Sequence, residues 1–305
     1  MSAQFVEVAL CLDAPYAPHA AVLMKSINAN TTRPVRFHVL DLDTPADARD
    51  KITGMVRARR GECLWYDVDH SVPDEATAHG WSPSASYRLL LPQMLPAEVK
   101  RVLYIDIDTV VFDDIGEVFD FDLAGHALAA VRDWPGSQED LDRRIEQLGS
   151  ADYFNSGLLL MDLDAWRREK LADQVWDAMV KAAGAFRFPD QDALNAVFAG
   201  RWRRLPDRWN MQRPIMKGTA SQLGFTPGEY IALALSPGMV HFTGSPKPWA
   251  GKQRHPFNWA YWRAARNTPF FENIKESSRG GYRKVTSRVS AYARFLLRVG
   301  LRALT

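Results

Sequence analysis

Asp106 directly follows the apolar run 102–105, and Asp108 comes two positions later. In extended backbone, side chains two positions apart point to the same side. Two carboxylates about 4 Å apart repel by roughly 4 kcal/mol at an effective dielectric constant of about 20, so the pair needs either solvent or a bound cation. Oxygen ligands of this kind favour Mn²⁺ or Mg²⁺. The alternative is that both residues begin a solvated turn together with Asp113 and Asp114.

A histidine and a lysine occur close together in the second half of the chain. His241 ends a short apolar run, and Gly244 and Lys247 follow it in what we expect to be a tight loop. An imidazole nitrogen added to carboxylates suits Mn²⁺ better than Ca²⁺. Lys247 would then reach a phosphate that the same metal holds. Taken alone, His241 is also consistent with a hydrogen-bonded structural histidine.

A third group of side chains has the chemistry to bind hydroxyl groups. Asn155 lies at the start of an apolar strand, and Asp190 and Gln191 open a helix at 193–198. Amide and carboxylate groups suit the fixed hydroxyl pattern of a sugar, and Arg88 could pair with a phosphate or a carboxylate. Two alternatives remain: Asp190 as a helix N-cap, and Arg88 as an ordinary charge on a helix surface.

Apolar runs that alternate with helical patterns must position these residues. Such alternation predicts an α/β fold with a mostly parallel sheet. The expected strands are 5–12, 35–40, 63–66, 102–105, 127–131 and 153–163, and the expected helices are 17–30, 45–60, 84–95 and 164–181. Residues 202–256 are rich in Pro and Trp and predict loops and short strands.

Asp13 and Asp106 each follow an apolar strand. In open α/β sheets, ligands bind beyond the carboxyl ends of the strands. If these two strands are parallel neighbours, the two carboxylates line one cleft. The chain contains neither a G-x-G-x-x-G nor a G-x-x-x-x-G-K-[ST] pattern, which argues against dinucleotide oxidoreductases and P-loop enzymes.

The charge of the chain is unevenly distributed. Its net charge is +2, but residues 275–305 hold eight Lys or Arg and one Glu, which is +7 and leaves about −5 for residues 1–274. We therefore expect a catalytic domain at 1–274 and a basic tail at 275–305. The near balance of the whole chain gives no indication of nucleic-acid binding.

The tail has the pattern of a basic amphipathic helix. Its apolar residues share one helical face and its basic residues lie on the other sides: Val285, Val289, Tyr292, Leu296 and Val299 against Arg283, Lys284, Arg294, Arg298 and Arg302. Such a helix suits an anionic membrane surface, which we expect to bind residues 277–305. The alternative is a terminal helix that packs on the body and exposes its basic side.

The cysteines and the ends of the chain bear on its location. The chain has two cysteines, and Cys11 lies within an apolar run, so a disulfide framework is not expected. The sequence shows neither an export signal nor an apolar run long enough to span a membrane. Together with the tail, these features predict a cytoplasmic protein, peripheral on the inner face of the inner membrane.

Taken together, the motifs resemble glycosyltransferase family eight, notably the bacterial lipopolysaccharide and lipooligosaccharide galactosyl- and glucosyltransferases, and more distantly glycogenin. The resemblance spans about residues 5–265, in the blocks 12–16, 87–89, 106–108, 154–157, 190–195 and 241–249. It implies a GT-A type fold. It also implies retaining transfer of galactose or glucose from a UDP-sugar to a saccharide or glycolipid acceptor, such as lipopolysaccharide core or another cell-surface glycan.

The resemblance also implies roles for individual residues. Asp13 and Tyr16 would contact uridine. Mn²⁺, with Mg²⁺ as an alternative, would bind Asp106, Asp108 and His241. Gly244 and Lys247 would hold the diphosphate. Other donor contacts would come from Arg88, Ile107, Asn155, Ser156 and Asp190, while Asp133 would contact donor or acceptor. Many bacterial members have Asp and Asn where this chain has Ala14 and Pro15, so the ribose contact stays open.

The predicted catalytic residues are Gln191 and Asp190, with Gln191 on the reactive face of the anomeric carbon. A Gln amide is a weak nucleophile, so we expect it to stabilise an oxocarbenium-like state while the acceptor attacks from the front face. Whether Gln191 is a nucleophile or a stabiliser stays open at this point.

Two rival interpretations remain. Residues 106–110 also fit the D-x-D-x-[T/V] pattern of haloacid-dehalogenase-like phosphatases, in which Asp106 would be the nucleophile. That motif usually follows the first strand of its domain, whereas about a hundred residues precede it here. The other rival is a non-catalytic relative that binds sugar nucleotides.

Overall fold

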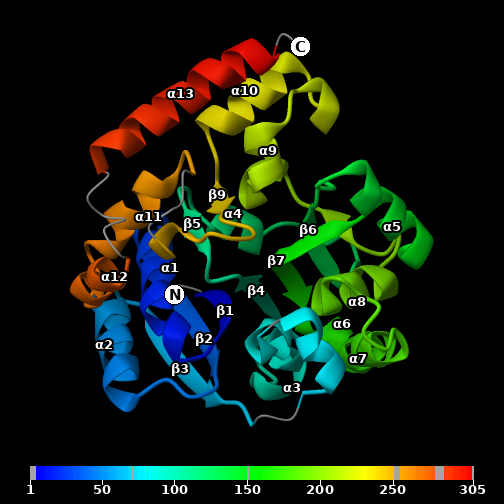
Figure 1. The fold of residues 1–305 in the computed structure, drawn as a ribbon. Helices are drawn as coiled ribbons and strands as arrows, with labels where there is room; N and C mark the ends of the chain where they lie inside the picture. The colour runs from blue at the N-terminus through cyan, green and yellow to red at the C-terminus, as the bar shows by residue number, and fades with distance from the viewer. Residues whose placement is uncertain are drawn as a thin grey trace.

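The computed structural model describes residues 5–69, 72–80, 82–149, 151–250, 255–278 and 285–303. A seven-stranded sheet in the order β3-β2-β1-β4-β7-β6-β8 forms the centre of the molecule (Figure 1). The strands are β1 (Val6–Leu12), β2 (Val35–Asp41), β3 (Glu62–Asp67), β4 (Arg101–Ile105), β6 (Leu128–Arg132), β7 (Phe154–Asp162) and β8 (Arg203–Arg204). Only β7 runs antiparallel to its neighbours β4 and β6. The predicted α/β fold with a mostly parallel sheet is confirmed.

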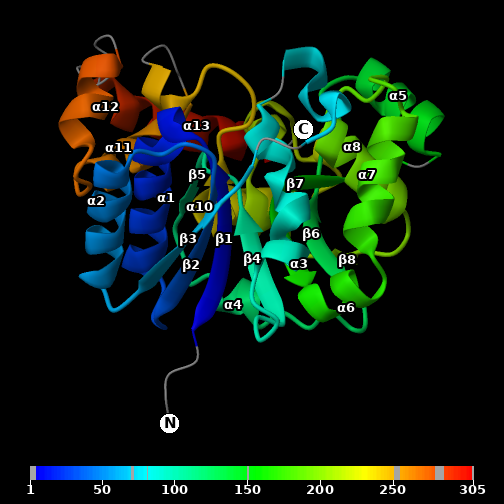
Figure 2. The same cartoon turned by 90° about the horizontal axis from the view of Figure 1, so that it is seen from below.

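Helices cover both faces of the sheet. One face packs against α1 (Ala17–Asn30) and α2 (Ala46–Arg57), and the other packs against η3 (Pro83–Leu90), α3 (Leu91–Met94), α6 (Leu163–Arg168), α7 (Leu171–Lys181) and α8 (Pro189–Val197). Figure 2 shows α1 and α2 on one side of the strands and α6, α7 and α8 on the other. β1 is buried on both sides, because Val8 and Leu10 enter one apolar cluster while Ala9 and Cys11 enter the other.

Two predicted helices differ from the structure. Most of 84–95 is the 3₁₀ helix η3, and the α-helical part is limited to the short α3, with Pro92 in its first turn. The predicted helix 164–181 is two helices, because Lys170 adopts a left-handed conformation with φ 51° between α6 and α7. This turn breaks the helical hydrogen bonds and lets Trp166 and Leu171 both enter the core. No glycine marks the break.

A second, two-stranded sheet joins the middle of the chain to its end. β5 (Thr109–Val111) pairs antiparallel with β9 (Met239–His241), and Thr109 is opposite His241. Because β5 follows β4 after a short turn, this pairing carries His241 to the carboxyl end of β4. The sheet therefore joins two of the three sequence motifs that predict the site.

The remaining elements are short. Residues 202–256 hold more helix than predicted: η4 (Asp207–Asn210), α9 (Arg213–Lys217), η5 (Ser221–Leu223), α10 (Pro227–Leu235) and η6 (Pro248–Ala250). A capping box between Thr226 and Glu229 starts α10. The others are η1 (Ala14–Tyr16), η2 (Asp74–Gly80), α4 (Gly116–Phe119), α5 (Gln138–Leu148), α11 (Asn258–Ala265), α12 (Phe271–Ser277) and α13 (Val285–Ala303).

The predicted basic helix corresponds to α13, which lies along α10 and also contacts α11 (Figure 1). Phe295 and Val299 are buried in the main core, and Tyr292 and Leu296 pack against it. The apolar face therefore packs on the body while Arg294 and Arg298 are exposed, as the alternative interpretation expected. Arg283 and Lys284 lie outside the described residues, as do the side chains of Val285, Val289 and Arg302. Across the described residues, none of the helices has the length and apolar character needed to cross a bilayer.

The burial of α13 predicts a measurable contribution to stability. Replacing Phe295, which is 4% exposed, by Ala removes a large side chain from the core, and we expect unfolding in urea to become easier by about 3 kcal/mol. Leu297→Ala on the same helix is the matched control: Leu297 is 71% exposed, so its loss should change stability by less than about 0.5 kcal/mol. Equal effects would show that α13 does not pack as described.

Candidate active site

A cavity of about 580 Å³ lies at the carboxyl ends of β1 and β4. All the predicted site residues line it except Asp13: Tyr16, Arg88, Asp106, Ile107, Asp108, Asp133, Asn155, Ser156, Asp190, Gln191, His241, Gly244 and Lys247. β1 and β4 are parallel neighbours as expected. Asp13 is next to the wall: its carboxylate accepts a hydrogen bond of 3.2 Å from the lining residue Ser82.

Asp106, Asp108 and His241 form a cluster whose candidate ligand atoms all lie within 4.8 Å of one another. His241 Nε2 is 3.0 Å from Asp108 Oδ1 and 3.7 Å from Asp106 Oδ2. Two carboxylates and one imidazole suit Mn²⁺ or Mg²⁺. The solvated-turn interpretation of the two aspartates is wrong, because their side chains face this cluster rather than bulk solvent.

Two cations compensate the carboxylates. Arg88 Nη2 is 3.1 Å from Asp106 Oδ1, and Arg88 Nε is 3.3 Å from Asp190 Oδ2. Lys247 Nζ donates to Asp108. Burial disfavours the charge of Asp108, but Lys247 and His241 outweigh it and hold the pKa of this carboxyl well below its usual range. Arg88 is only 3% exposed, so its interpretation as a surface helix charge is wrong.

A chain of amide groups orients His241. The Gly157 N–H donates to Asn155 Oδ1 at 3.0 Å, and Asn210 Nδ2 donates to the same oxygen at 2.8 Å. The carbonyl oxygen of Asn210 therefore faces His241 Nδ1, at 3.1 Å. Because a backbone N–H can only donate, this order places a proton on Nδ1 and turns Nε2 toward the carboxylates, where it can donate to Asp108 as an imidazolium or offer its lone pair to a bound metal.

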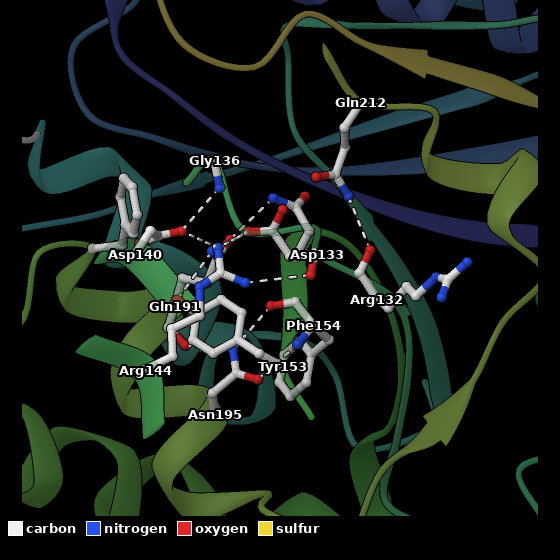
Figure 3. A network of polar contacts seen from close by, with 12 residues as sticks. Arg132, Asp133, Gly136, Asp140, Arg144, Tyr153, Phe154, Gln191, Asn195 and Gln212 are labelled. Carbon is white, nitrogen blue, oxygen red and sulfur yellow. Dashed lines mark hydrogen bonds and ion pairs between the residues drawn. The ribbon is translucent and has the colours of Figure 1, made fainter. Parts of the chain in front are cut away.

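Gln191 lines the same cavity, and hydrogen bonds hold its amide group. Its Oε1 accepts hydrogen bonds from the Ser156 N–H at 3.0 Å and from Asn155 Nδ2 at 3.1 Å. Its Nε2 donates to Asp133 Oδ2 and to the Tyr153 hydroxyl, both at 3.1 Å (Figure 3). Burial raises the pKa of Asp133 to about 6, although the guanidinium of Arg144 opposes the rise. The protein therefore satisfies both ends of the Gln191 amide.

Asp190 does not cap its helix. α8 begins at Pro189, its N-cap is Phe188, and no side chain caps it. The carboxylate of Asp190 instead faces Arg88 and accepts a hydrogen bond of 3.4 Å from Ser156 Oγ. The capping interpretation is therefore wrong.

An aromatic cluster anchors the loop that carries Gly244 and Lys247. The Trp249 indole stacks on the His19 imidazole, with ring centroids 3.8 Å apart, and meets Tyr16 edge-on at 6.0 Å. His19 Nδ1 is 2.7 Å from the Tyr261 hydroxyl, and burial lowers the pKa of His19 to about 3. A neutral His19 therefore holds Trp249, and with it the loop, against α1 and α11.

Several residues of the site have no motif that predicts them. Asn210 orients His241, and the Tyr104 hydroxyl donates to Asp106 Oδ1 at 2.7 Å. Tyr153 and Arg144 contact Gln191 and Asp133. Tyr104 sits two positions before Asp106 and points to the same side of β4, a spacing from which its contact could have been expected. Tyr153 directly precedes the block 154–157, whereas Arg144 and Asn210 come from segments without a motif.

The sequence of the chain is similar to one protein family and to several known proteins. The model of Glycosyl transferase family 8 matches residues 7–253. General stress protein A of Bacillus subtilis (strain 168) is 29% identical over 267 residues, which cover 85% of this chain and 92% of that protein. Lipopolysaccharide 1,2-glucosyltransferase of Escherichia coli (strain K12) is 31% identical over 194 residues, which cover 62% of this chain and 56% of that protein.

Solved structures show the same fold. The galactosyltransferase LgtC, solved in complex with donor and acceptor sugar analogs, superposes with a TM-score of 0.75 and 25% identity over 87% of this chain and 96% of that chain. The bifunctional glycosyltransferase WbbM in its apo form superposes with a TM-score of 0.73 and 22% identity over 92% of this chain and 52% of that chain. The expected GT-A type fold is thereby confirmed.

The packing of His241 predicts that Gly157 is essential for metal binding. A Cβ at position 157 would lie 2.3 Å from His241 Cε1 and 2.7 Å from Nδ1, so Gly157→Ala must displace the imidazole. We expect Mn²⁺ affinity, measured by titration calorimetry, to fall at least about tenfold. Gly54→Ala in α2, where a Cβ meets nothing within 4 Å, is the control and should bind Mn²⁺ like the wild type. Unchanged affinity in a folded Gly157→Ala protein would contradict this arrangement.

Proposed function

The chain belongs to glycosyltransferase family 8, and from this premise we propose that it transfers galactose or glucose from a UDP-sugar to a saccharide or glycolipid acceptor with retention of configuration. As a glycosyltransferase it uses a nucleotide-sugar donor and a saccharide acceptor. The observation that carries the proposal is the cluster of Asp106, Asp108 and His241 in the wall of the main cavity, flanked by two cations. In the proposed reaction these three residues hold Mn²⁺, or Mg²⁺ in its place.

At the nucleotide end, Asp13 and Tyr16 are proposed to contact uridine. Among the described residues, Asp13 Oδ1 is buried and accepts no hydrogen bond. An unpaired buried carboxylate oxygen is costly, so a ligand N–H at this position would be strongly favoured. Tyr16 lines the cavity beside Trp249 and offers an aromatic face to the base.

At the diphosphate, Gly244 and Lys247 are proposed to bind the leaving group. Departure of UDP builds negative charge on the β-phosphate oxygen, and a bound Mn²⁺ would stabilise that charge as a Lewis acid. Lys247 lies beside Asp108, so its ammonium group is within reach of the same phosphate. Gly244, with φ 68°, gives the loop a conformation that other residues rarely adopt. Ile107 completes the wall next to the two aspartates.

At the sugar, Arg88, Asn155, Ser156 and Asp190 are proposed to position the ring, and Asp133 to contact donor or acceptor. The hydrogen bonds of Gln191 support a stabilising role over a nucleophilic one. Its Oε1 accepts from the Ser156 N–H and from Asn155, which lowers the availability of its lone pairs. A fixed amide dipole at this place favours an oxocarbenium-like state and front-face attack by the acceptor.

The phosphatase interpretation finds less support in the geometry. A phosphatase of that class needs Asp106 as a free nucleophile, whereas Arg88 and the Tyr104 hydroxyl both engage Asp106 Oδ1. The family assignment also argues against it. A non-catalytic relative would show the same contacts, and an activity measurement separates it from an enzyme.

The proposed reaction predicts metal-dependent release of UDP. With UDP-galactose or UDP-glucose and water as the default acceptor, we expect slow hydrolysis of one donor in Mn²⁺ and none in EDTA. Asp108→Asn keeps the shape of the side chain but removes the charge that holds the metal, so hydrolysis should fall at least about a hundredfold. Asp177→Asn, an exposed aspartate on α7 outside the cavity, is the control and should retain wild-type hydrolysis. UDP binding without hydrolysis would favour the non-catalytic relative.

We also propose that the chain binds an anionic membrane surface through residues 277–305, on the cytoplasmic face of the inner membrane. The apolar face of α13 packs inward, so the contact must use the outer face. That face presents Arg294, Leu297, Arg298 and Leu301, all exposed, and the neighbouring α10 exposes Leu235. Exposed leucines beside arginines suit the boundary between lipid headgroups and acyl chains.

This surface predicts binding to anionic vesicles that weakens with salt. Each arginine contributes up to about 1 kcal/mol near such a surface, so replacing both Arg294 and Arg298 by Gln should weaken binding by up to about thirtyfold. Co-sedimentation with phosphatidylserine-containing vesicles measures this change. Replacing the exposed Arg57 and Arg59 by Gln, at and just beyond the end of α2, which lies away from α13 in Figure 1, is the charge-matched control. Equal losses in both pairs would show that only overall charge matters.

A further inference from the structure

The helix α5, beside Asp133 and Gln191, buries two charged side chains and exposes an apolar one. Its two buried residues are Asp140 and Arg144, while Ile145 is 47% exposed. Burying charged groups is costly unless they are paired and hydrogen-bonded. Hydrophobic burial therefore does not explain why α5 docks where it does, and its polar contacts must.

Arg144 connects α5 to Asp133. Its Nη2 is 3.3 Å from Asp133 Oδ2 and 2.8 Å from Asp140 Oδ2, and its Nη1 donates to the Asp133 carbonyl oxygen at 3.3 Å. The guanidinium also lies over the ring of Tyr153, with its central carbon 4.1 Å from the ring centroid. Arg144 therefore holds both the backbone and the side chain of Asp133.

Tyr153 connects Arg144, which lies over its aromatic ring, to Gln191. Its hydroxyl accepts from Gln191 Nε2 at 3.1 Å and donates to Asp192 Oδ1. Arg143 then donates to Asp192 Oδ2 and to Asp140 Oδ1, both at 3.1 Å. The contacts form a closed ring, part of which Figure 3 shows: Arg144, Asp133, Gln191, Tyr153, Asp192, Arg143 and Asp140.

We propose that Arg144 and Tyr153 are positioning residues, which hold the Asp133 carboxylate and the Gln191 amide in one relative orientation toward the reacting sugars. This inference rests on the proposed function. Tyr153 is not part of the cavity wall, so it acts through Gln191 rather than on a substrate. Asp133 Oδ2 accepts hydrogen bonds from both Gln191 and Arg144. No described residue donates to Asp133 Oδ1, which leaves that oxygen for a sugar hydroxyl.

The charges around Asp133 give the proposal a distinct signature. Arg144 and Asp140 face it from α5, Gln191 faces it from α8, and His241 adds charge from β9 when protonated. Burial raises the pKa of Asp133 to about 6, Asp140 adds to the rise, and Arg144 opposes it. Asp133 is therefore ionised above about pH 6, and losing Arg144 would move its ionisation to higher pH.

The test compares Arg144→Gln, Arg144→Lys and Tyr153→Phe with the wild-type chain in the UDP-release assay. We expect kcat to fall about 10- to 100-fold in Arg144→Gln and Tyr153→Phe, with KM for the UDP-sugar changed less than about threefold. The acidic limb of the kcat–pH profile should move to higher pH in Arg144→Gln and return toward the wild type in Arg144→Lys. Mn²⁺ binding, measured over the same pH range, keeps loss of metal apart from protonation of Asp133.

Arg143→Gln is the matched control, because Arg143 belongs to the ring but does not contact Asp133. Its acidic limb should stay at the wild-type pH. A folded Arg144→Gln protein with unchanged kcat and an unchanged acidic limb would overturn the inference. Circular dichroism shows whether Arg144→Gln folds. If it does not, the inference is judged on kcat and the acidic limb of the less disruptive variants Arg144→Lys and Tyr153→Phe. A wild-type chain that releases no UDP overturns the proposed function and this inference with it, whereas an active wild type with unaffected variants overturns the inference alone.

Discussion

The site is organised around the repulsion between two carboxylates at the end of one strand. Asp106 and Asp108 extend β4 into a cavity where water screens their charges poorly, so each must face a cation or a hydrogen-bond donor. Arg88 comes from η3, His241 from β9 and Lys247 from the loop beyond it. The β5–β9 sheet carries His241 to β4, and the Trp249–His19 stack anchors the loop that carries Lys247. Elements outside the central sheet thus supply the groups that compensate the charges of these two carboxylates.

A second constraint comes from two backbone N–H groups of β7. The pairing of β6 with β7 shifts register at Ala130 and Val131, so Ser156 and Gly157 are not paired with β6. Bulges of this kind release backbone groups from the ladder and re-aim side chains. The N–H of Gly157, whose carbonyl oxygen accepts from the Asp106 N–H of β4, sets the direction of the amide chain that orients His241, and the N–H of Ser156 binds Gln191. The predicted metal ligand His241 and the predicted catalytic amide of Gln191 therefore take their orientations from neighbouring peptide groups.

Much of this could be predicted from the sequence, for reasons that also explain what could not. Buried strands such as 102–105 and amphipathic helices such as 17–30 have local periodicity, and the motifs placed all but one of the predicted site residues in the cavity wall. Lys170 breaks a predicted helix without a glycine, and Asn210 reaches His241 only through tertiary contacts, so neither has a local pattern. The packing partner of the tail could not be predicted for the same reason. Its apolar stripe is equally suited to lipid or to α10, and periodicity alone does not distinguish the two.

Two parts of the cavity wall are held in different ways, and the difference bears on specificity for the acceptor. The predicted metal ligand His241 and the carbonyl end of Gln191 depend on backbone groups of the central sheet, which cannot change without disturbing the core. The part of the wall formed by α5 and the turn before it depends on side-chain ion pairs. It consists of Gly136, Ser137, Asp140 and Arg144. Side chains on a peripheral helix can be replaced without changing the sheet. Asp140 and Arg144 are nevertheless tied to the ring that holds Asp133, so we expect differences in the acceptor to be matched by changes at Gly136 and Ser137 of this wall.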